Sequence, residues 1–249
     1  MKVQIDMGMP SRMSQPIGTY IDQTNRLIVA AYPKGLMVGL LFGPIGILTV
    51  DAIDRSSVKR ECGEPVSRLN ADWSTLSTNI FTELLQEKPP TVRLEFDSGT
   101  QSLTLRPYGI LNVQNQTSVK LFAVLEATLS TQTGETLWEA RYFVPTEHAY
   151  SLTSAQGWTT PGVYQSELTG GLKTAYSILL RQIDSKPTEG NEITAEFLTP
   201  YMAKAFPVKG QIIGEENGYV LFQAKLADAI PCAGCYVLKK KDIKLVDQR

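Results

Sequence analysis

VKLFAVLEATLSTQTGETLWEARYFV, residues 119–144, is the stretch that decides the fold. Apolar residues occupy alternate positions from Val119 to Leu129, so they share one face of an extended strand. The opposite face includes Lys120, Glu126 and Thr128. After the polar segment STQTG, the alternation resumes at Trp138, Ala140 and Tyr142. We therefore predict a long antiparallel hairpin with one face against a core.

Two amphipathic helices are predicted to pack on this sheet. From Pro65 to Glu87, apolar residues recur every three or four positions, which indicates a helix that begins at Pro65 and ends before the Pro89-Pro90 pair. The same spacing from Leu168 to Ile183 indicates a second helix, and a linker follows at residues 186–187.

Further strands are predicted on both sides of these elements. NRLIVAAY, residues 25–32, has the apolar, β-branched character of a buried strand. TVRLEF and SLTLRPY flank the turn residues DSGTQ and indicate a hairpin over residues 91–108. From Phe206 the chain contains a strand, an Asn217-Gly218 turn and a second strand, followed by two more short strands around a tight turn in residues 235–246.

These elements predict an α/β (α+β) fold, in which a mixed or antiparallel sheet is packed by two amphipathic helices and carries a small β-rich C-terminal unit. Residues 1–24 lack periodicity and are interpreted as a loose N-terminal leader. Residues 25–188 form the main α/β domain, and residues 189–249 form the small β-rich C-terminal domain.

Composition excludes several classes of function. The 24 basic and 25 acidic residues give a formal net charge of −1, which offers no attraction to nucleic acid. The sequence has no phosphate-binding glycine motif. One histidine and three cysteines, with a single C-x-x-C spacing, do not supply a zinc site. We expect no cofactor, no metal ion and no nucleic-acid partner.

Catalytic residues are not predicted either. His148 is the single histidine, and no G-x-S-x-G elbow is present to supply a serine nucleophile, so His148 is interpreted as a loop histidine. The alternative is a hydrolase or transferase with a noncanonical site in the loop around His148 and Trp158.

The spacing Cys232-Ala-Gly-Cys235 raises the question of redox chemistry. Because it leads into a predicted strand and not into a helix N-terminus, a structural disulfide that closes a turn is the first interpretation. Two free thiols and a redox pair are the alternatives.

The segment GLMVGLLFGPIGILTV, residues 35–50, contains no charge. As a helix it would be about 24 Å long, shorter than a hydrocarbon core of about 30 Å, and Pro44 would interrupt it. Its glycines are interpreted as turn or loop residues over a core, with membrane contact and homo-oligomer packing as alternatives. The candidate interaction residues are Gly35, Gly39, Phe42 and Gly43.

The turn Thr133-Gly134 and the following Leu137-Trp138 pair resemble a motif of bacterial envelope proteins, the curli-secretion-lipoprotein and TolB N-terminal-domain class. In that class a strand ends in D-x-x-T-G and the next begins with a hydrophobic-Trp pair; here Ser130 stands at the position of the Asp. The order of elements over residues 25–184 is similar too.

The resemblance implies a non-enzymatic, periplasmic accessory or assembly protein that contacts other envelope proteins, and it implies a lipoprotein with a membrane anchor. The alternative within the envelope is a subunit of an export channel or pore that oligomerises through residues 35–50.

Overall fold

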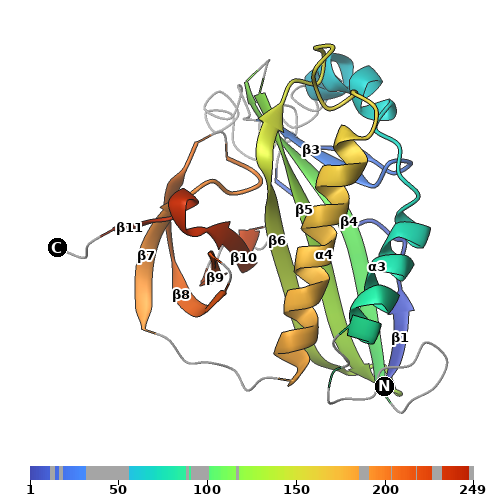
Figure 1. Cartoon of the computed structure of the whole chain (residues 1–249), viewed down its shortest axis with the longest axis vertical. Coiled ribbons are helices and arrows are strands. Elements are labelled where there is room, and N and C mark those ends of the chain that lie inside the picture. Colours follow the sequence, from blue (N-terminus) through green and yellow to red (C-terminus); the bar gives the residue numbers. More distant parts are fainter. Residues whose placement is uncertain are drawn as a thin grey trace, which may run out of the picture.

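The computed structural model describes residues 1–11, 15–16, 19–31, 56–87, 90, 101–115, 118–184, 191–202, 204–216, 218–225 and 232–246. Within these ranges the chain has a mixed α/β fold, with an 11-stranded, mostly antiparallel sheet and helices at residues 56–67, α3 (Trp73–Glu87) and α4 (Val163–Asp184) (Figure 1). The strand order is β11-β7-β8-β9-β10-β6-β5-β4-β3-β2, and β1 pairs with β4 beside β3.

The strands have the following bounds: β1 Lys2–Ile5, β2 Tyr20–Asp22, β3 Leu27–Ala31, β4 Gln101–Asn115, β5 Ser118–Thr131, β6 Thr136–Tyr150, β7 Glu192–Phe197, β8 Phe206–Glu216, β9 Tyr219–Ala224, β10 Gly234–Lys239 and β11 Lys244–Val246. A short 3₁₀ turn, η3 (Lys240–Asp242), separates β10 from β11.

The hairpin predicted at residues 119–144 is confirmed as β5 and β6. Its turn is closed by the amide of Thr131, which donates to the carbonyl of Glu135 at 2.8 Å, and Gly134 has a φ of +86°, which a glycine adopts without strain. One face packs in a core as expected, but Phe122 and Val124 on the other face are also fully buried. The expectation of a single buried face is therefore incomplete.

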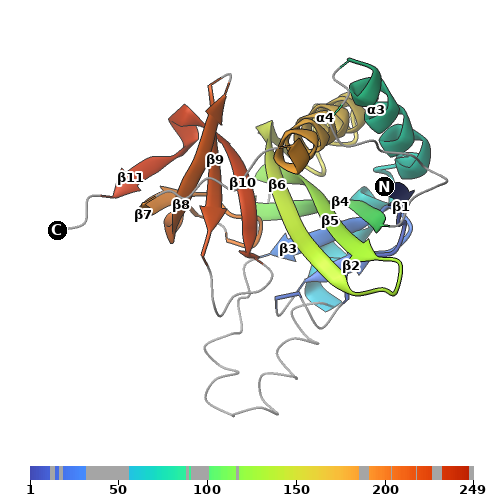
Figure 2. The same ribbon diagram turned by 90° about the horizontal axis from the view of Figure 1, so that it is seen from below.

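The first core lies between the sheet and the helices. Alternate residues of β5, from Val119 to Ala127, share this core with the apolar sides of α3 and α4. In both views the two helices lie together over one face of β4, β5 and β6 (Figures 1 and 2). Trp158 is fully buried, and its indole Nε1 donates to the carbonyl of Val119 at 2.8 Å. This bond ties the loop before α4 to the start of β5.

Helix α4 lies close against β5 at Gly171, where a Cβ would lie 2.6 Å from the Cβ of Ala123. We expect Gly171→Ala to lower the free energy of unfolding by about 1–3 kcal/mol, because the helix must move away from the sheet. At the neighbouring Gly170 a Cβ would meet nothing within 4 Å, so Gly170→Ala should raise stability by about 0.5–1 kcal/mol through helix propensity. Denaturant unfolding compares the two; equal effects would show that the close approach is not needed.

The prediction that the first helix begins at Pro65 is wrong. Residues 56–67 are helical, the chain turns at residues 68–72, and α3 begins at Trp73. The side chain of Asp72 accepts a hydrogen bond from the amide of Thr75 at 3.0 Å, as an N-cap does. The apolar spacing continues through the break because Val66 and Leu69 pack in the same core as α3. The second helix, α4, is confirmed.

The N-terminal residues also differ from the expected loose leader, because β1 pairs in parallel with residues 102–105 of β4. Val3 is buried, and the amide of Asp6 donates to the carbonyl of Leu105 at 2.8 Å. The Arg26 guanidinium holds this segment through the carbonyls of Met7 and Gly8. A strand of four residues is too short to show a period in the sequence.

The C-terminal strands pack against the face of the main sheet that the helices leave open. A second buried cluster contains Phe122 of β5 and Phe143 of β6 together with Phe197, Phe222 and Tyr236. The ring of Phe143 stacks on that of Tyr236 with centroids 4.8 Å apart. The domain boundary between residues 188 and 189 stays a prediction. The second buried cluster contains side chains from both sides of this boundary.

Other predicted strands have mixed outcomes. β3, β8 and β9 are confirmed, with Gly218 in the turn at a φ of +81°. The last two strands exist, but β10 pairs with β9 and β6 while β11 pairs with β7. β7 was not predicted, although Ile193, Ala195 and Phe197 alternate with polar residues as in a half-buried strand. The segment 91–96 lies outside the described residues.

Candidate functional site

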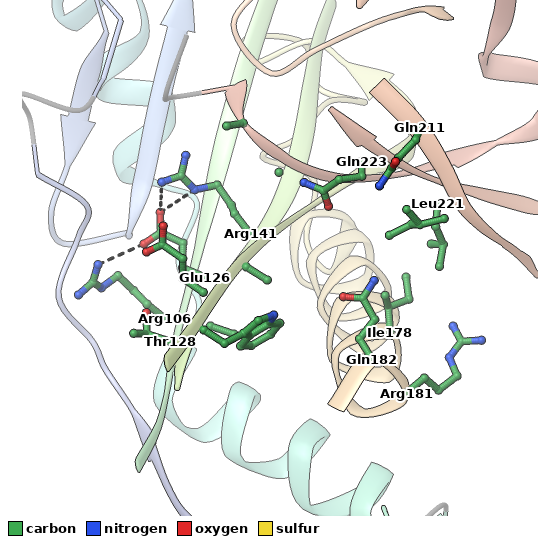
Figure 3. A pocket seen from close by; sticks show the side chains of 17 residues that line it. Arg106, Glu126, Thr128, Arg141, Ile178, Arg181, Gln182, Gln211, Leu221 and Gln223 are labelled. Carbon is green, nitrogen blue, oxygen red and sulfur yellow. Dashed lines mark hydrogen bonds and ion pairs between the residues drawn. The ribbon is translucent and has the colours of Figure 1, made fainter. Parts of the chain in front are cut away.

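A groove of about 770 Å³ lies between β6, α4 and the β8–β9 pair. Figure 3 shows its two sides, with Arg106, Glu126 and Arg141 on one and the side chains of α4, β8 and β9 on the other. Three elements that are far apart in the sequence therefore form one site.

The groove exists because β6 and β10 pair over a very short length. Their parallel ladder contains only Cys235 opposite Tyr142 and Tyr236 opposite Phe143. From Thr136 to Ala140, β6 pairs with β5 alone among the strands that the structure describes. Successive side chains of a strand point to opposite faces, yet Trp138, Glu139 and Ala140 all line the groove. The groove therefore runs along the edge of the strand and not over one face of it.

The wall next to α4 is apolar with a polar margin. Trp138 of β6, Ile178 of α4 and Leu221 of β9 belong to the first core or pack against it. The hydroxyl of Tyr142 donates to Oε1 of Gln182 at 2.6 Å, which fixes the Gln182 amide at this wall. Gln211 and Gln223 line the facing side.

The other wall is a charged row across three strands, in which Arg106, Glu126 and Arg141 stand directly opposite one another. Nη1 of Arg106 lies 3.1 Å from Oε2 of Glu126, and Nη2 of Arg141 lies 2.8 Å from Oε1 of the same carboxylate. The buried Tyr108 hydroxyl also donates to Oε1 at 3.0 Å. Nη2 of Arg106 also lies 2.6 Å from Oδ2 of Asp6, so Arg106 pairs with two carboxylates.

The electrostatic surroundings of Arg141 and Asp6 favour the charged forms of these two side chains. Burial lowers the pKa of the Arg141 guanidinium, but Tyr108 and Glu126 raise it by more, so the pKa of Arg141 lies above its ordinary value. A hydrogen bond from the Gly8 amide and the charge of Arg106 hold the pKa of Asp6 below its ordinary value. The row is therefore a fixed ionic structure, and its carboxylates and guanidinium groups hold one another in place.

Arg181 provides a further positive charge at the α4 side of the groove. Its Nε donates to the carbonyl of Ser177 at 3.4 Å, one turn earlier in the helix. Burial lowers the pKa of Arg181 from its ordinary value.

The predicted sites lie elsewhere. Gly35, Gly39, Phe42 and Gly43 are outside the described residues. His148 is on β6 and exposed, with Nδ1 3.2 Å from Oε1 of Glu167, and it does not line the groove. Trp158, the other residue of the alternative hydrolase site, is a buried structural residue. Neither of these two residues lines the groove.

The expected disulfide between Cys232 and Cys235 is not formed, because both are free thiols. Cys235 packs in the first core, whereas Cys232 packs against the second cluster, so the two side chains lie toward different sides of the sheet. Burial raises the pKa of Cys232 to about 11 and that of Cys235 to about 12. Neither thiol is activated as a redox nucleophile would be.

No protein-family model and no curated protein matches this chain. In the described part of the chain, no group of three or more His, Cys, Asp and Glu side chains is placed to hold a metal ion. None of the described helices combines the length and apolar character needed to cross a membrane.

Sequence reasoning missed the groove. Trp138 and Ala140 were placed correctly on the core face, but the open edge of β6 depends on where β10 stops pairing with it, about 90 residues later in the chain. The charged row left a weak signal, because Glu126 and Arg141 occur in the two strands of the hairpin predicted at residues 119–144, whereas Arg106 was assigned to the separate hairpin over residues 91–108.

Proposed function

We propose that this chain is a non-enzymatic accessory or assembly protein of the bacterial envelope, located in the periplasm and acting through contacts with other envelope proteins. The compartment, and a lipoprotein anchor with it, rest on the resemblance of the Thr133–Trp138 turn to envelope proteins. The mode of action rests on the groove.

The observation that carries the proposal is an open strand edge at the side of a groove. Unpaired N–H and C=O groups at a sheet edge are a template for pairing with another chain, and proteins normally cover them. Here the edge from Thr136 to Ala140 is bordered by walls from α4, β8 and β9. Binding a polypeptide in such a place needs backbone pairing and fitted walls, and it needs no nucleophile, base or cofactor.

In this proposal the finer features of the fold have assigned roles. The two amphipathic helices α3 and α4 cover one face of the main sheet, and α4 supplies one wall of the groove. The small β-rich C-terminal unit covers the opposite face and supplies the second wall through β8 and β9. The function thus requires both units together.

Site-specific photo-crosslinking in the native cells tests this function. Leu137 lies on the open stretch of β6 and its side chain is 47% exposed, so a photoreactive amino acid there would contact a bound partner. Leu245, 57% exposed on β11 at the far edge of the sheet, is the matched control position. We expect a discrete adduct from position 137, recovered with the envelope fraction, and none from position 245.

Two results would contradict the proposal. Equal labelling from both positions, or none from position 137 in folded protein, would show that the groove is not a contact surface. Recovery of the protein in the cytosol would contradict the proposed compartment.

A further inference from the structure

The charged side chains in and beside the groove balance one another. The charged row and Asp6 together hold two carboxylates and two guanidinium groups, which are joined by ion pairs of 2.6–3.1 Å. The remaining charged side chains among the described lining residues are Glu139 and Arg181, one of each sign. A charged occupant would lose hydration in the groove without meeting an excess of opposite charge. The groove therefore favours an uncharged occupant.

Three glutamines supply neutral polar groups to the groove. Gln211 of β8 and Gln223 of β9 stand directly opposite each other in the antiparallel ladder, where paired Cβ atoms lie about 4.5–5.5 Å apart. Figure 3 shows these two side chains together on one side of the groove, and Gln182 on α4. Primary amides from three elements therefore meet in one space.

These amides have hydrogen-bonding groups to offer to a ligand. The hydroxyl of Tyr142 donates to Oε1 of Gln182 and orients this amide, whose Nε2 keeps its two N–H donors. In the described part of the chain, the side chains of Gln211 and Gln223 make no hydrogen bond, so each offers two donors and an acceptor. All three side chains are half-buried, and a ligand with matching groups would replace the water that solvates them.

Apolar surface lies beside the amides. Trp138, Ile178 and Leu221 line the same groove, and the indole of Trp138 provides a flat apolar face with an N–H at its edge. A polypeptide carries both kinds of group at a regular spacing, because its backbone has one amide per residue between the side chains. A glutamine side chain can pair with the C=O and the N–H of such a backbone at the same time.

Recognition by these side chains does not need a regular strand edge on β6. The ladder between β5 and β6 pairs Leu129 with Trp138 and Ser130 with Thr136, so it skips Leu137. The three glutamines stand on α4, β8 and β9, and their positions are therefore independent of this irregularity.

We propose that the groove binds an uncharged, extended segment of a partner protein, whose backbone amides pair with Gln182, Gln211 and Gln223 and whose apolar side chains pack on Trp138. This inference rests on the proposed function, because it names the part of the envelope partner that the groove recognises. The glutamines select a backbone whose amides are not already paired in a helix or sheet, and the balanced charges discriminate against acidic and basic segments.

The probe is a blocked seven-residue peptide of alternating valine and serine, and two matched peptides carry glutamate or lysine in place of serine. Trp73 and Trp158 are buried, so a change in tryptophan emission on binding reports Trp138. We expect the uncharged peptide to bind about fivefold or more tightly than either charged peptide. A charged peptide that binds equally well would overturn the neutral occupant. Absence of binding by the uncharged peptide at about 1 mM would overturn the site.

The role of the amides is tested by combining Gln211→Met with Gln223→Met, which removes two amides and keeps side chains of similar length. The double variant should bind the uncharged peptide about tenfold more weakly, and each single variant about threefold more weakly. The single variants provide the test if the double variant does not fold. Gln165→Met, at an exposed position of α4 outside the groove, is the control and should bind normally. Unchanged binding by the Gln211 and Gln223 variants would overturn their assigned contacts.

N-methylation tests whether the glutamines pair with the peptide backbone. Two derivatives of the uncharged peptide carry N-methyl groups, one on its valines and the other on its serines. At least one derivative should bind the unaltered protein about tenfold more weakly than the parent, and most of that loss should disappear in the double variant. An equal loss in both proteins would overturn the pairing.

An oligomer of N-acetylglucosamine distinguishes the class of ligand, since it is uncharged and carries amide groups without a polypeptide backbone. We expect it to bind more weakly than the uncharged peptide. Tighter binding of the sugar, lost in the double variant, would overturn the assignment of a polypeptide.

These results are separable from those for the proposed function. If position 137 crosslinks a partner in cells but the uncharged peptide does not bind, recognition by the glutamines fails and the protein-contact function stands. If the crosslink also fails, both fall.

Discussion

Replacing Phe143 with alanine is expected to lower the free energy of unfolding by about 3–5 kcal/mol, which is the usual cost of removing a fully buried aromatic ring. Phe143 lies where β6 meets β10, and its ring stacks on Tyr236 at 4.8 Å. Tyr236 in turn contacts Phe197 of β7, with ring centroids 4.9 Å apart. The cavity would therefore open between the main sheet and the C-terminal strands and not within one of them.

The Phe143→Ala variant also tests whether residues 189–249 are a separate domain. If the second buried cluster joins the two parts into one cooperative unit, Phe143→Ala should increase hydrogen exchange equally in β5 and in β8–β9. Leu137→Ala, on the same strand but exposed, is the control and should change stability by less than about 0.5 kcal/mol. Two resolved unfolding transitions, with β8–β9 unaffected by the substitution, would support the predicted boundary instead.

The sequence patterns correctly predicted which side chains of β5 and α4 face the first core, because this depends on the spacing of residues within one element. The alternation in residues 119–129 fixes which side chains of β5 face the helices, and the spacing from Leu168 to Ile183 fixes the inner side of α4. The second face of β5 was not predictable in the same way. Phe122 and Val124 occupy that face between polar residues, and the chain that covers them begins about 70 residues later at β7. Burial of that face is a property of tertiary packing, which no local period encodes.

Register explains why the charged row was missed. Thr131 faces Glu135 at the turn, and continued pairing from there would place Glu126 opposite Ala140. An irregularity between Leu129 and Ser130 shifts the ladder by one residue and brings Glu126 opposite Arg141. A shift of one residue moves a side chain to the other face of a strand, so a bulge that is invisible in the sequence decides whether this ion pair forms.

Loss of the Glu126 carboxylate is the second large effect that we expect. Glu126 is 14% exposed and is shared by two arginines and the Tyr108 hydroxyl, so Glu126→Gln would leave two neighbouring guanidinium groups without their common anion. Removing one partner of a buried ion pair costs about 3–5 kcal/mol. Because Arg106 is 35% and Arg141 20% exposed, water would solvate part of the charge, and we expect a loss of about 2–3 kcal/mol.

Glu139→Gln provides the matched control, since Glu139 also lines the groove on β6 but is exposed. It should change stability by less than about 0.5 kcal/mol. Urea unfolding of both variants, and of Glu126→Gln combined with Arg141→Gln, would give the coupling energy, which we expect to be about 1–2 kcal/mol. A loss in Glu126→Gln no larger than in Glu139→Gln would contradict the structural role of the row.

Glu126 also lies where it can affect the geometry of the groove. Its ion pair with Arg141 lies one residue before β6 begins to pair with β10, and therefore at the end of the open edge. The pair fixes β6 against β5 at the point where support from β10 ends. Glu126→Gln should accordingly increase hydrogen exchange at residues 136–140 more than elsewhere in β6. A uniform increase along the strand would instead show that the charged row stabilises the sheet without setting the geometry of its open edge.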